Sequence, residues 1–137
     1  MILPTGALVA VLDGHRLRLF RNKGHEPAID LVALSDPDLE GYHAGSGGRH
    51  RSTPATPDVS RLREDDFIAA VGAFLNRSAL EDTIQSLLVI ADPRSLGELR
   101  RHFHPTLLEK IVAEIPKDLR EHSPADIRAA ILHAGER

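Results

Sequence analysis

The chain has 137 residues, 42% of them hydrophobic and 27% charged, which is typical of one soluble globular domain. Its 17 Lys and Arg residues stand against 20 Asp and Glu residues, a formal net charge of −3. This balance excludes a strongly basic nucleic-acid binder but leaves room for a local basic patch. Cysteine is absent, which excludes disulfides, thiol catalysis and cysteine-ligated metal centres.

The apolar runs are far shorter than the roughly 20 residues that a membrane-spanning helix needs. The N-terminal residues show neither a positive segment nor a small-residue cleavage site of the kind that marks a secretion signal. We therefore expect a single domain over residues 1–137, located in the cytoplasm and without contact with a membrane.

The first 34 residues predict three strands joined by tight turns. Residues 7–12 are apolar throughout, as in a central strand covered on both faces. The pair Asp13-Gly14 predicts a hairpin in which glycine adopts a positive φ. Residues 15–22 alternate between apolar and basic side chains, and residues 28–34 form a third apolar segment.

Residues 41–62 are rich in Gly, Ser, Thr, Pro and Arg and offer almost nothing to bury. This composition predicts a long mobile loop. A structureless loop longer than roughly 12–15 residues inside a compact domain is usually functional or disordered.

Helices and strands alternate in the remainder of the chain. Asp92-Pro93 and Ser123-Pro124 each pair a capping side chain with proline at the first helical position. Pro116 restricts the last strand to a sheet edge, because proline cannot donate a hydrogen bond to a ladder. We expect helices at 63–80, 93–103 and 106–113, strands at 86–91 and 115–119, and a final helix that begins after Ser123.

This order of elements predicts an α/β fold whose sheet is antiparallel in its first half and parallel in its second. The arrangement is ribonuclease-H-like, with five strands in a mixed sheet of spatial order 3-2-1-4-5. The proline-containing strand then falls at an edge, which agrees with its composition.

Several segments together resemble the host attachment protein family, described as proteins required for attachment to host cells. The resemblance covers nearly the whole chain. The segments are Val9–Gly14, Arg18–Asn22, Gly45–His50, Asp65–Phe67, Ala91–Arg100 and Lys117–Leu119. This family is in turn similar to a bacterial and archaeal group that resembles the middle domain of the class-one translation release factor. The resemblance implies the same ribonuclease-H-like fold.

In the release factor, a loop between the third strand and the first long helix carries Gly-Gly-Gln and helps water attack the peptidyl-tRNA ester. The corresponding loop here carries Gly47-Gly48-Arg49, followed by His50 and Arg51. Arginine cannot accept a hydrogen bond from water as an amide can, so we do not expect ester hydrolysis. Arginine beside glycine suits phosphate contact instead. We therefore expect a binding domain for ribosomes or structured RNA that needs no cofactor.

Arg94, Arg100 and Arg101 form a second basic stretch, which could join the loop in one phosphate-binding face. The simpler interpretation is a solvated helix face.

A metal-dependent nuclease is an alternative, because ribonuclease-H-like nucleases gather carboxylates around two Mg²⁺ ions. The candidates are Asp13, Asp92 and one acid of the run Glu64–Asp66. Each has a simpler role in a turn, a helix cap or a helix start, and the turn would place Asp13 away from Asp92. We therefore expect no metal site. A third alternative is a factor that is required only indirectly for attachment to host cells.

Overall fold

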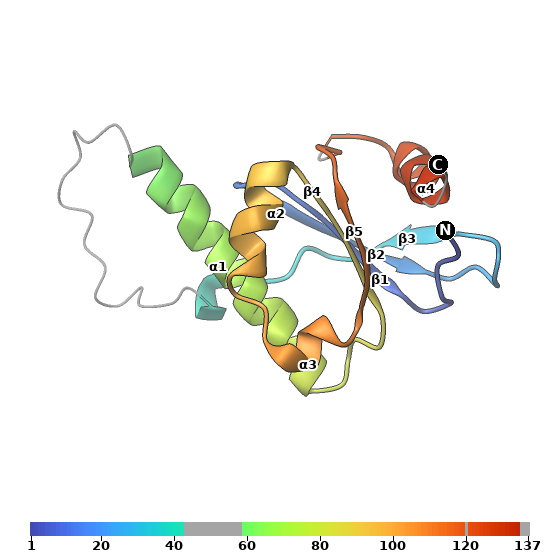
Figure 1. The fold of residues 1–137 in the computed structure, drawn as a ribbon, viewed down its shortest axis with the longest axis horizontal. Helices are drawn as coiled ribbons and strands as arrows, with labels where there is room; N and C mark the ends of the chain where they lie inside the picture. The colour runs from blue at the N-terminus through green and yellow to red at the C-terminus, as the bar shows by residue number, and fades with distance from the viewer. Residues whose placement is uncertain (43–58, 120, 135–137) are drawn as a thin grey trace.

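A five-stranded mixed sheet forms the centre of the computed structural model, which describes residues 1–42, 59–119 and 121–134 (Figure 1). The strand order is β3-β2-β1-β4-β5, as the sequence predicts. β1 pairs antiparallel with β2 and parallel with β4, and β5 lies parallel to β4 at the edge. The strands are β1 (Leu8–Leu12), β2 (Leu17–Asn22), β3 (Leu31–Ala33), β4 (Leu87–Ala91) and β5 (Ile111–Pro116).

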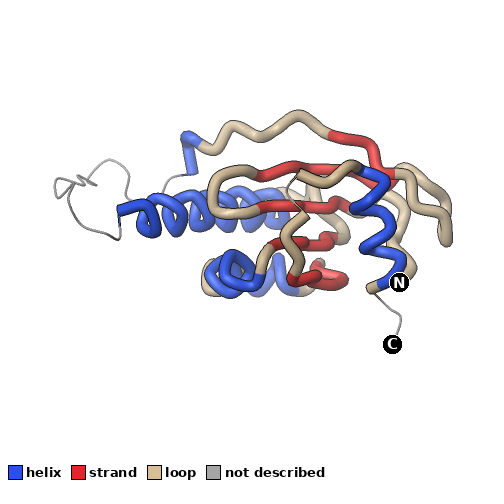
Figure 2. The backbone as a smooth tube through the Cα atoms, turned by 90° about the horizontal axis from the view of Figure 1, so that it is seen from above, coloured by secondary structure: helices blue, strands red, loops and turns tan. Residues whose placement is uncertain are grey.

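Helices cover both faces of this sheet (Figures 1 and 2). α1, α2 and α3 pack on one face, and α4 packs on the other. A short 3-10 turn, η1 (Glu40–Tyr42), lies against α1. The helices are α1 (Val59–Leu80), α2 (Pro93–Arg100), α3 (Pro105–Leu108) and α4 (Pro124–His133).

The two sides of β1 belong to two different cores, which explains why this strand is apolar throughout. Leu8, Ala10 and Leu12 pack with the face that α1 and α2 cover. Val9 and Val11 pack with the face that α4 covers. Successive side chains of a strand point to opposite faces, so a central strand must be apolar at every position.

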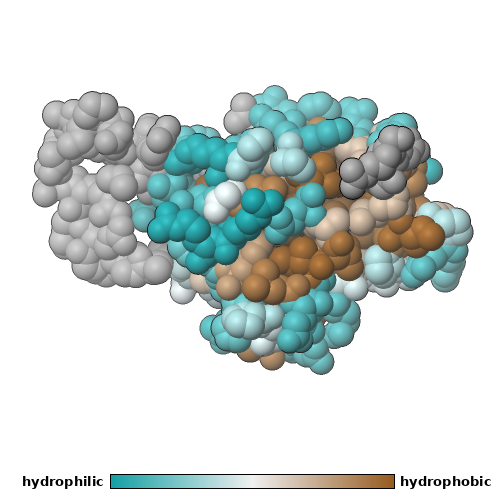
Figure 3. Space-filling view, viewed as in Figure 1, coloured by the Kyte–Doolittle hydropathy of each residue, from teal (hydrophilic) through white to brown (hydrophobic). Residues whose placement is uncertain are grey.

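The edge strand β5 leaves apolar surface uncovered. In Figure 3, apolar residues form a band across the middle of the face on which β5 lies. Val112 of this strand is 40% exposed, and Leu108 just before it is 52% exposed.

Several predicted boundaries are wrong. The predicted helix 106–113 ends at Leu108, and the strand predicted at 115–119 begins at Ile111. α1 begins at Val59, so residues 59–62 belong to a helix and not to the predicted loop. The remainder of that loop, apart from residues 41–42 in η1, lies outside the described residues.

No helix within residues 1–42, 59–119 and 121–134 is long and apolar enough to cross a membrane.

Candidate functional site

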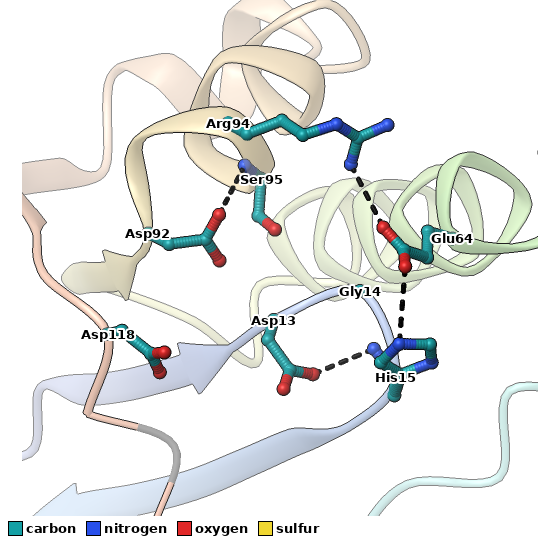
Figure 4. Close-up of a pocket in the computed structure, with 8 residues that line it drawn as sticks. All are labelled: Asp13, Gly14, His15, Glu64, Asp92, Arg94, Ser95 and Asp118. Carbon is teal, nitrogen blue, oxygen red and sulfur yellow. Dashed lines mark hydrogen bonds and ion pairs between the residues drawn. The ribbon is translucent and has the colours of Figure 1, made fainter. Parts of the chain in front are cut away.

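A polar pocket of about 250 Å³ opens where the parallel strands β1, β4 and β5 end (Figure 4). Ligand sites of open α/β sheets commonly lie at the carboxyl ends of their strands. The residues that line this pocket come from turns that follow strands and from the starts of α1 and α2. They are Asp13, Gly14, His15, Glu64, Asp92, Arg94, Ser95 and Asp118.

Strand pairing places Asp13 and Asp92 at the same pocket. Leu12, the last residue of β1, is the partner of Ala91, the last residue of the parallel strand β4. Asp13 and Asp92 directly follow these two residues in the chain. The sequence-based expectation that Asp13 lies away from Asp92 is therefore wrong. That expectation considered the turn alone, whereas the register between two strands distant in sequence decides which side chains meet.

The buried carboxylate of Asp13 shapes the hairpin between β1 and β2. Its Oδ1 accepts the backbone N–H of His15 at 2.7 Å and that of Arg16 at 2.8 Å. The N–H of Asp13 donates to the carbonyl of Arg16 at 3.1 Å. Side-chain bonds of this kind replace backbone bonds in a turn, so Asp13 has a structural role in addition to lining the pocket.

Position 14 requires glycine because the hairpin backbone lies close to α1, and not because of its backbone conformation. Gly6 is the one described glycine with a positive φ, so the predicted positive φ of Gly14 is wrong. A Cβ on Gly14 would lie 2.8 Å from Cγ and 2.9 Å from Cβ of Glu64, which are closer than atoms can pack. Glycine therefore lets the hairpin rest directly on α1.

Contacts from Arg94 and His15 hold Glu64 across the pocket. Arg94 Nη1 lies 3.3 Å from Glu64 Oε1, and His15 Nε2 lies 3.3 Å from Glu64 Oε2. Arg94 also donates to Asp65 Oδ1 at 2.8 Å. These contacts tie the start of α2 and the β1–β2 hairpin to α1 (Figure 4).

The predicted caps of α2 and α4 are confirmed. Asp92 Oδ2 accepts the N–H of Ser95 at 3.1 Å, and Pro93 occupies the first turn of α2. Ser123 Oγ accepts the N–H of Asp126 at 3.1 Å. A capping side chain satisfies one of the N–H groups that a helix start leaves without an intrahelical partner.

The predicted basic stretch is divided between the two ends of α2. Arg94 lies in the first turn, and Arg100 and Arg101 lie about 9 Å further along the helix axis. Each guanidinium has a carboxylate partner: Arg100 pairs with Glu114 at 2.6 Å and Arg101 with Glu98 at 3.2 Å. The structure does not bring these arginines to one point. The other predicted contacts, Gly47, Gly48, Arg49, His50 and Arg51, lie outside the described residues.

Within the described part of the chain, no three His, Asp or Glu side chains are arranged to hold a metal ion directly. Asp13 and Asp92 therefore share a pocket, as a nuclease would require, but the described residues lack the ligand geometry of a two-metal centre. His104 caps α3, where its Nδ1 accepts the N–H of Thr106 at 3.0 Å. His102, just beyond the end of α2, has its Nε2 3.3 Å from Oε2 of Glu98.

Four residues that line the pocket were not among the site candidates of the sequence analysis, namely Gly14, His15, Ser95 and Asp118. Ser95 is nearly fully buried at 2% exposure and stands in the first turn of α2. Asp118 follows the end of β5, but the predicted strand 115–119 placed it inside the sheet. The sequence did hold one signal for this pocket, because an aspartate directly follows each of the apolar strands β1 and β4. Recognising that Asp118 belongs with them required the correct end of β5.

Comparison with known proteins shows the family. No match was found among curated proteins. The family model described as "Bacterial archaeo-eukaryotic release factor family 12" matches residues 6–131, which is nearly the whole chain. This match supports the resemblance to the release factor, but its description does not mention host attachment. Because the match covers nearly the whole chain and the sheet order is consistent with it, the chain belongs to bacterial archaeo-eukaryotic release factor family 12.

Proposed function

We propose that this chain is a binding domain for ribosomes or structured RNA, and that it acts in the cytoplasm. Its membership of a release-factor family over residues 6–131 carries the proposal. Release factors of this type work in the peptidyl transferase centre, where their loop before the first long helix meets RNA. The 137 residues of the chain correspond in size to one domain.

The segment that precedes α1 supplies the chemistry of the proposed contact. It carries Gly47-Gly48-Arg49 and Arg51 in the sequence order in which a release factor carries Gly-Gly-Gln. Glycine permits close approach of the backbone to a ligand, and guanidinium pairs with phosphate oxygens. Arg49 stays charged and accepts no hydrogen bond, so the proposed activity is binding and not hydrolysis of peptidyl-tRNA.

The arginines of α2 are a weaker source of phosphate contacts. Arg94, Arg100 and Arg101 each form an ion pair with a carboxylate of the chain itself. A phosphate would have to displace these partners, whose side chains are already in place. We therefore assign the main phosphate contacts to Arg49 and Arg51.

The dependence of binding on salt tests this assignment. Each phosphate contact releases counterions, so the slope of log K against log [salt] measures the number of contacts. In binding to purified ribosomes, the double variant Arg49→Ala, Arg51→Ala should reduce this slope by roughly 1.5.

A matched double variant removes two positive charges elsewhere. Arg77 is exposed near the end of α1, and Lys117 is exposed after β5. The variant Arg77→Ala, Lys117→Ala should keep the slope of the unmodified chain. An equal slope for both double variants, or no ribosome binding by the unmodified chain, would overturn the proposal.

A role in attachment to host cells, which the resemblance implies, would follow indirectly from this function. Changed translation alters the surface proteins that a cell makes, so attachment would change without this chain reaching the surface.

A further inference from the structure

The two edges of the sheet differ in how much backbone they offer to a partner. β3 forms one edge with three residues, and a very short edge strand gives little to pair with. β5 forms the other edge with six residues, and among the described strands it pairs only with β4. In Figure 1, β5 runs between α2 and α4 with no described element in front of it. An uncovered edge of this kind can accept another extended segment through its backbone N–H and C=O groups.

The start of β5 also presents an apolar side chain that belongs to neither core. The register of β5 against β4 shifts by one residue, which makes Val112 the additional residue of a bulge. Ile111 packs with one core and Ala113 with the other, whereas Val112 is 40% exposed. From Ala113 to Pro116 the strand continues in regular register. This edge is the part of the molecule where Figure 3 shows the apolar band.

The sequence around β5 is complementary to itself in charge. Residues 109–117 read Glu-Lys-Ile-Val-Ala-Glu-Ile-Pro-Lys, with Ala113 at the centre. Two copies of a strand related by a twofold axis run antiparallel, and residues equally far from the axis face each other. With the axis at Ala113, Glu109 of one copy faces Lys117 of the second copy at both ends of the pairing. An axis at Glu114 would instead place two carboxylates opposite each other, which is unfavourable.

The charges at the two ends of this segment are available to a partner. Glu109 and Lys117 are both exposed, and among the described residues neither side chain has a hydrogen-bond or ion-pair partner. Glu114 in the middle of β5 pairs with Arg100 at 2.6 Å. The charge within the strand is therefore neutralised inside the chain, and the charges at its ends remain to select what pairs with it.

We propose that β5 pairs antiparallel with β5 of a second copy of this chain, around a twofold axis at Ala113. The pairing joins two five-stranded sheets into one and covers the exposed side chain of Val112. A second copy fits this edge because each end charge of the segment finds its opposite in the same segment. A pairing centred on one strand is a small interface, so we expect a dimer that dissociates on dilution. The surface contains none of the residues that we assign to the ribosome contact, so the two proposals stand independently.

Exchange of the end charges tests the pairing, with the dissociation constant measured by sedimentation equilibrium of the full chain from micromolar to millimolar concentration. Lys117→Glu places like charges opposite each other at both ends of the dimer and should raise the dissociation constant about 10-fold. Addition of Glu109→Lys to this variant makes the facing charges opposite again and should restore the constant of the unmodified chain. Lys23→Glu, exposed after β2, makes the same change in net charge and should leave the constant unaffected. Circular dichroism verifies the fold of each variant.

A disulfide tests the position of the axis, because the chain has no cysteine of its own. Ala113→Cys places one thiol of each copy at the axis, where facing Cβ atoms of an antiparallel pair lie about 4.5–5.5 Å apart. This is close to the spacing that a disulfide spans. Oxidation with copper–phenanthroline should link this variant into a covalent dimer faster than Leu80→Cys, whose position at the end of α1 is 59% exposed.

Four results would overturn the proposal. They are a monomer at every concentration, a dissociation constant that Lys117→Glu leaves unchanged, a weakening that the added Glu109→Lys does not reverse, and equal rates of linking in the two cysteine variants. Each of these results is obtained without ribosomes and leaves the proposed function untouched.

Discussion

At Gly14, a single hydrogen atom in place of a side chain allows the β1–β2 hairpin to rest on α1. An added Cβ would meet Glu64 at both its Cγ and its Cβ, and the Cβ cannot move without moving the helix. Gly14→Ala should therefore lower the free energy of unfolding by about 1–3 kcal/mol, measured by urea denaturation. The same shift would also separate Glu64 from His15 and Arg94.

Gly97 provides the matched control for this substitution. It lies within α2, and no atom is within 4 Å of an added Cβ. Gly97→Ala should raise the free energy of unfolding by about 0.5–1 kcal/mol, because alanine has the higher helix propensity. Equal stability of the two alanine variants would contradict the close contact between Gly14 and Glu64.

Asp82 ends α1 in a left-handed conformation, with φ of 64°, and pairs with Lys110 at 3.0 Å. The hydrogen bond from Lys110, followed by that from Gln85, lowers the pKa of the Asp82 carboxyl below its ordinary value. A lowered pKa stabilises the fold above the ordinary pKa of about 3.9, and this contribution is lost as pH falls through the folded-state value. An NMR titration should show the low pKa, and Lys110→Ala should return it towards normal. An unchanged pKa in that variant would show that Lys110 is not the cause.

At the scale of elements, α4 depends on its cap. α4 contributes Ile127 and Ile131, both fully buried, to the second face of the sheet. Ser123→Ala would leave the N–H of Asp126 without its acceptor and should cost about 1 kcal/mol. Amide hydrogen exchange should become faster throughout α4 in this variant, whereas Ser123→Asp should keep the slow exchange. Unchanged exchange in Ser123→Ala would mean that packing alone holds the helix.

Caps and hairpins were predictable from the sequence because they depend on residues close together in the chain. The boundary between α3 and β5 was not. Leu107, Leu108, Ile111 and Val112 have helical spacing, so the pattern alone favours one continuous helix. In the structure, Ile111 pairs with Leu87 of β4, and the segment that begins at Ile111 forms the edge strand of the sheet. A tertiary contact therefore overrides the local pattern.

At the scale of the whole molecule, the sheet order could be predicted because each strand carries its own signal. Strand β1 is apolar on both sides and therefore central, and Pro116 places β5 at an edge. The pocket could not be predicted in the same way. It depends on the register that sets Leu12 beside Ala91, and no single segment contains that information. Asp13 and Asp92 each have a local structural role, which concealed their shared position.

The most direct test of the central claim is co-sedimentation of the tagged chain with ribosomes from cell lysate. The comparison is a triple variant, Gly47→Ala, Gly48→Ala, Arg49→Ala, with its fold verified by circular dichroism. Our account predicts that the unmodified chain sediments with ribosomes and that the triple variant stays in the supernatant. Absence of both proteins from the ribosome fraction, or equal amounts of both in it, would contradict the proposal that this release-factor-type domain binds ribosomes through its Gly-Gly-Arg segment.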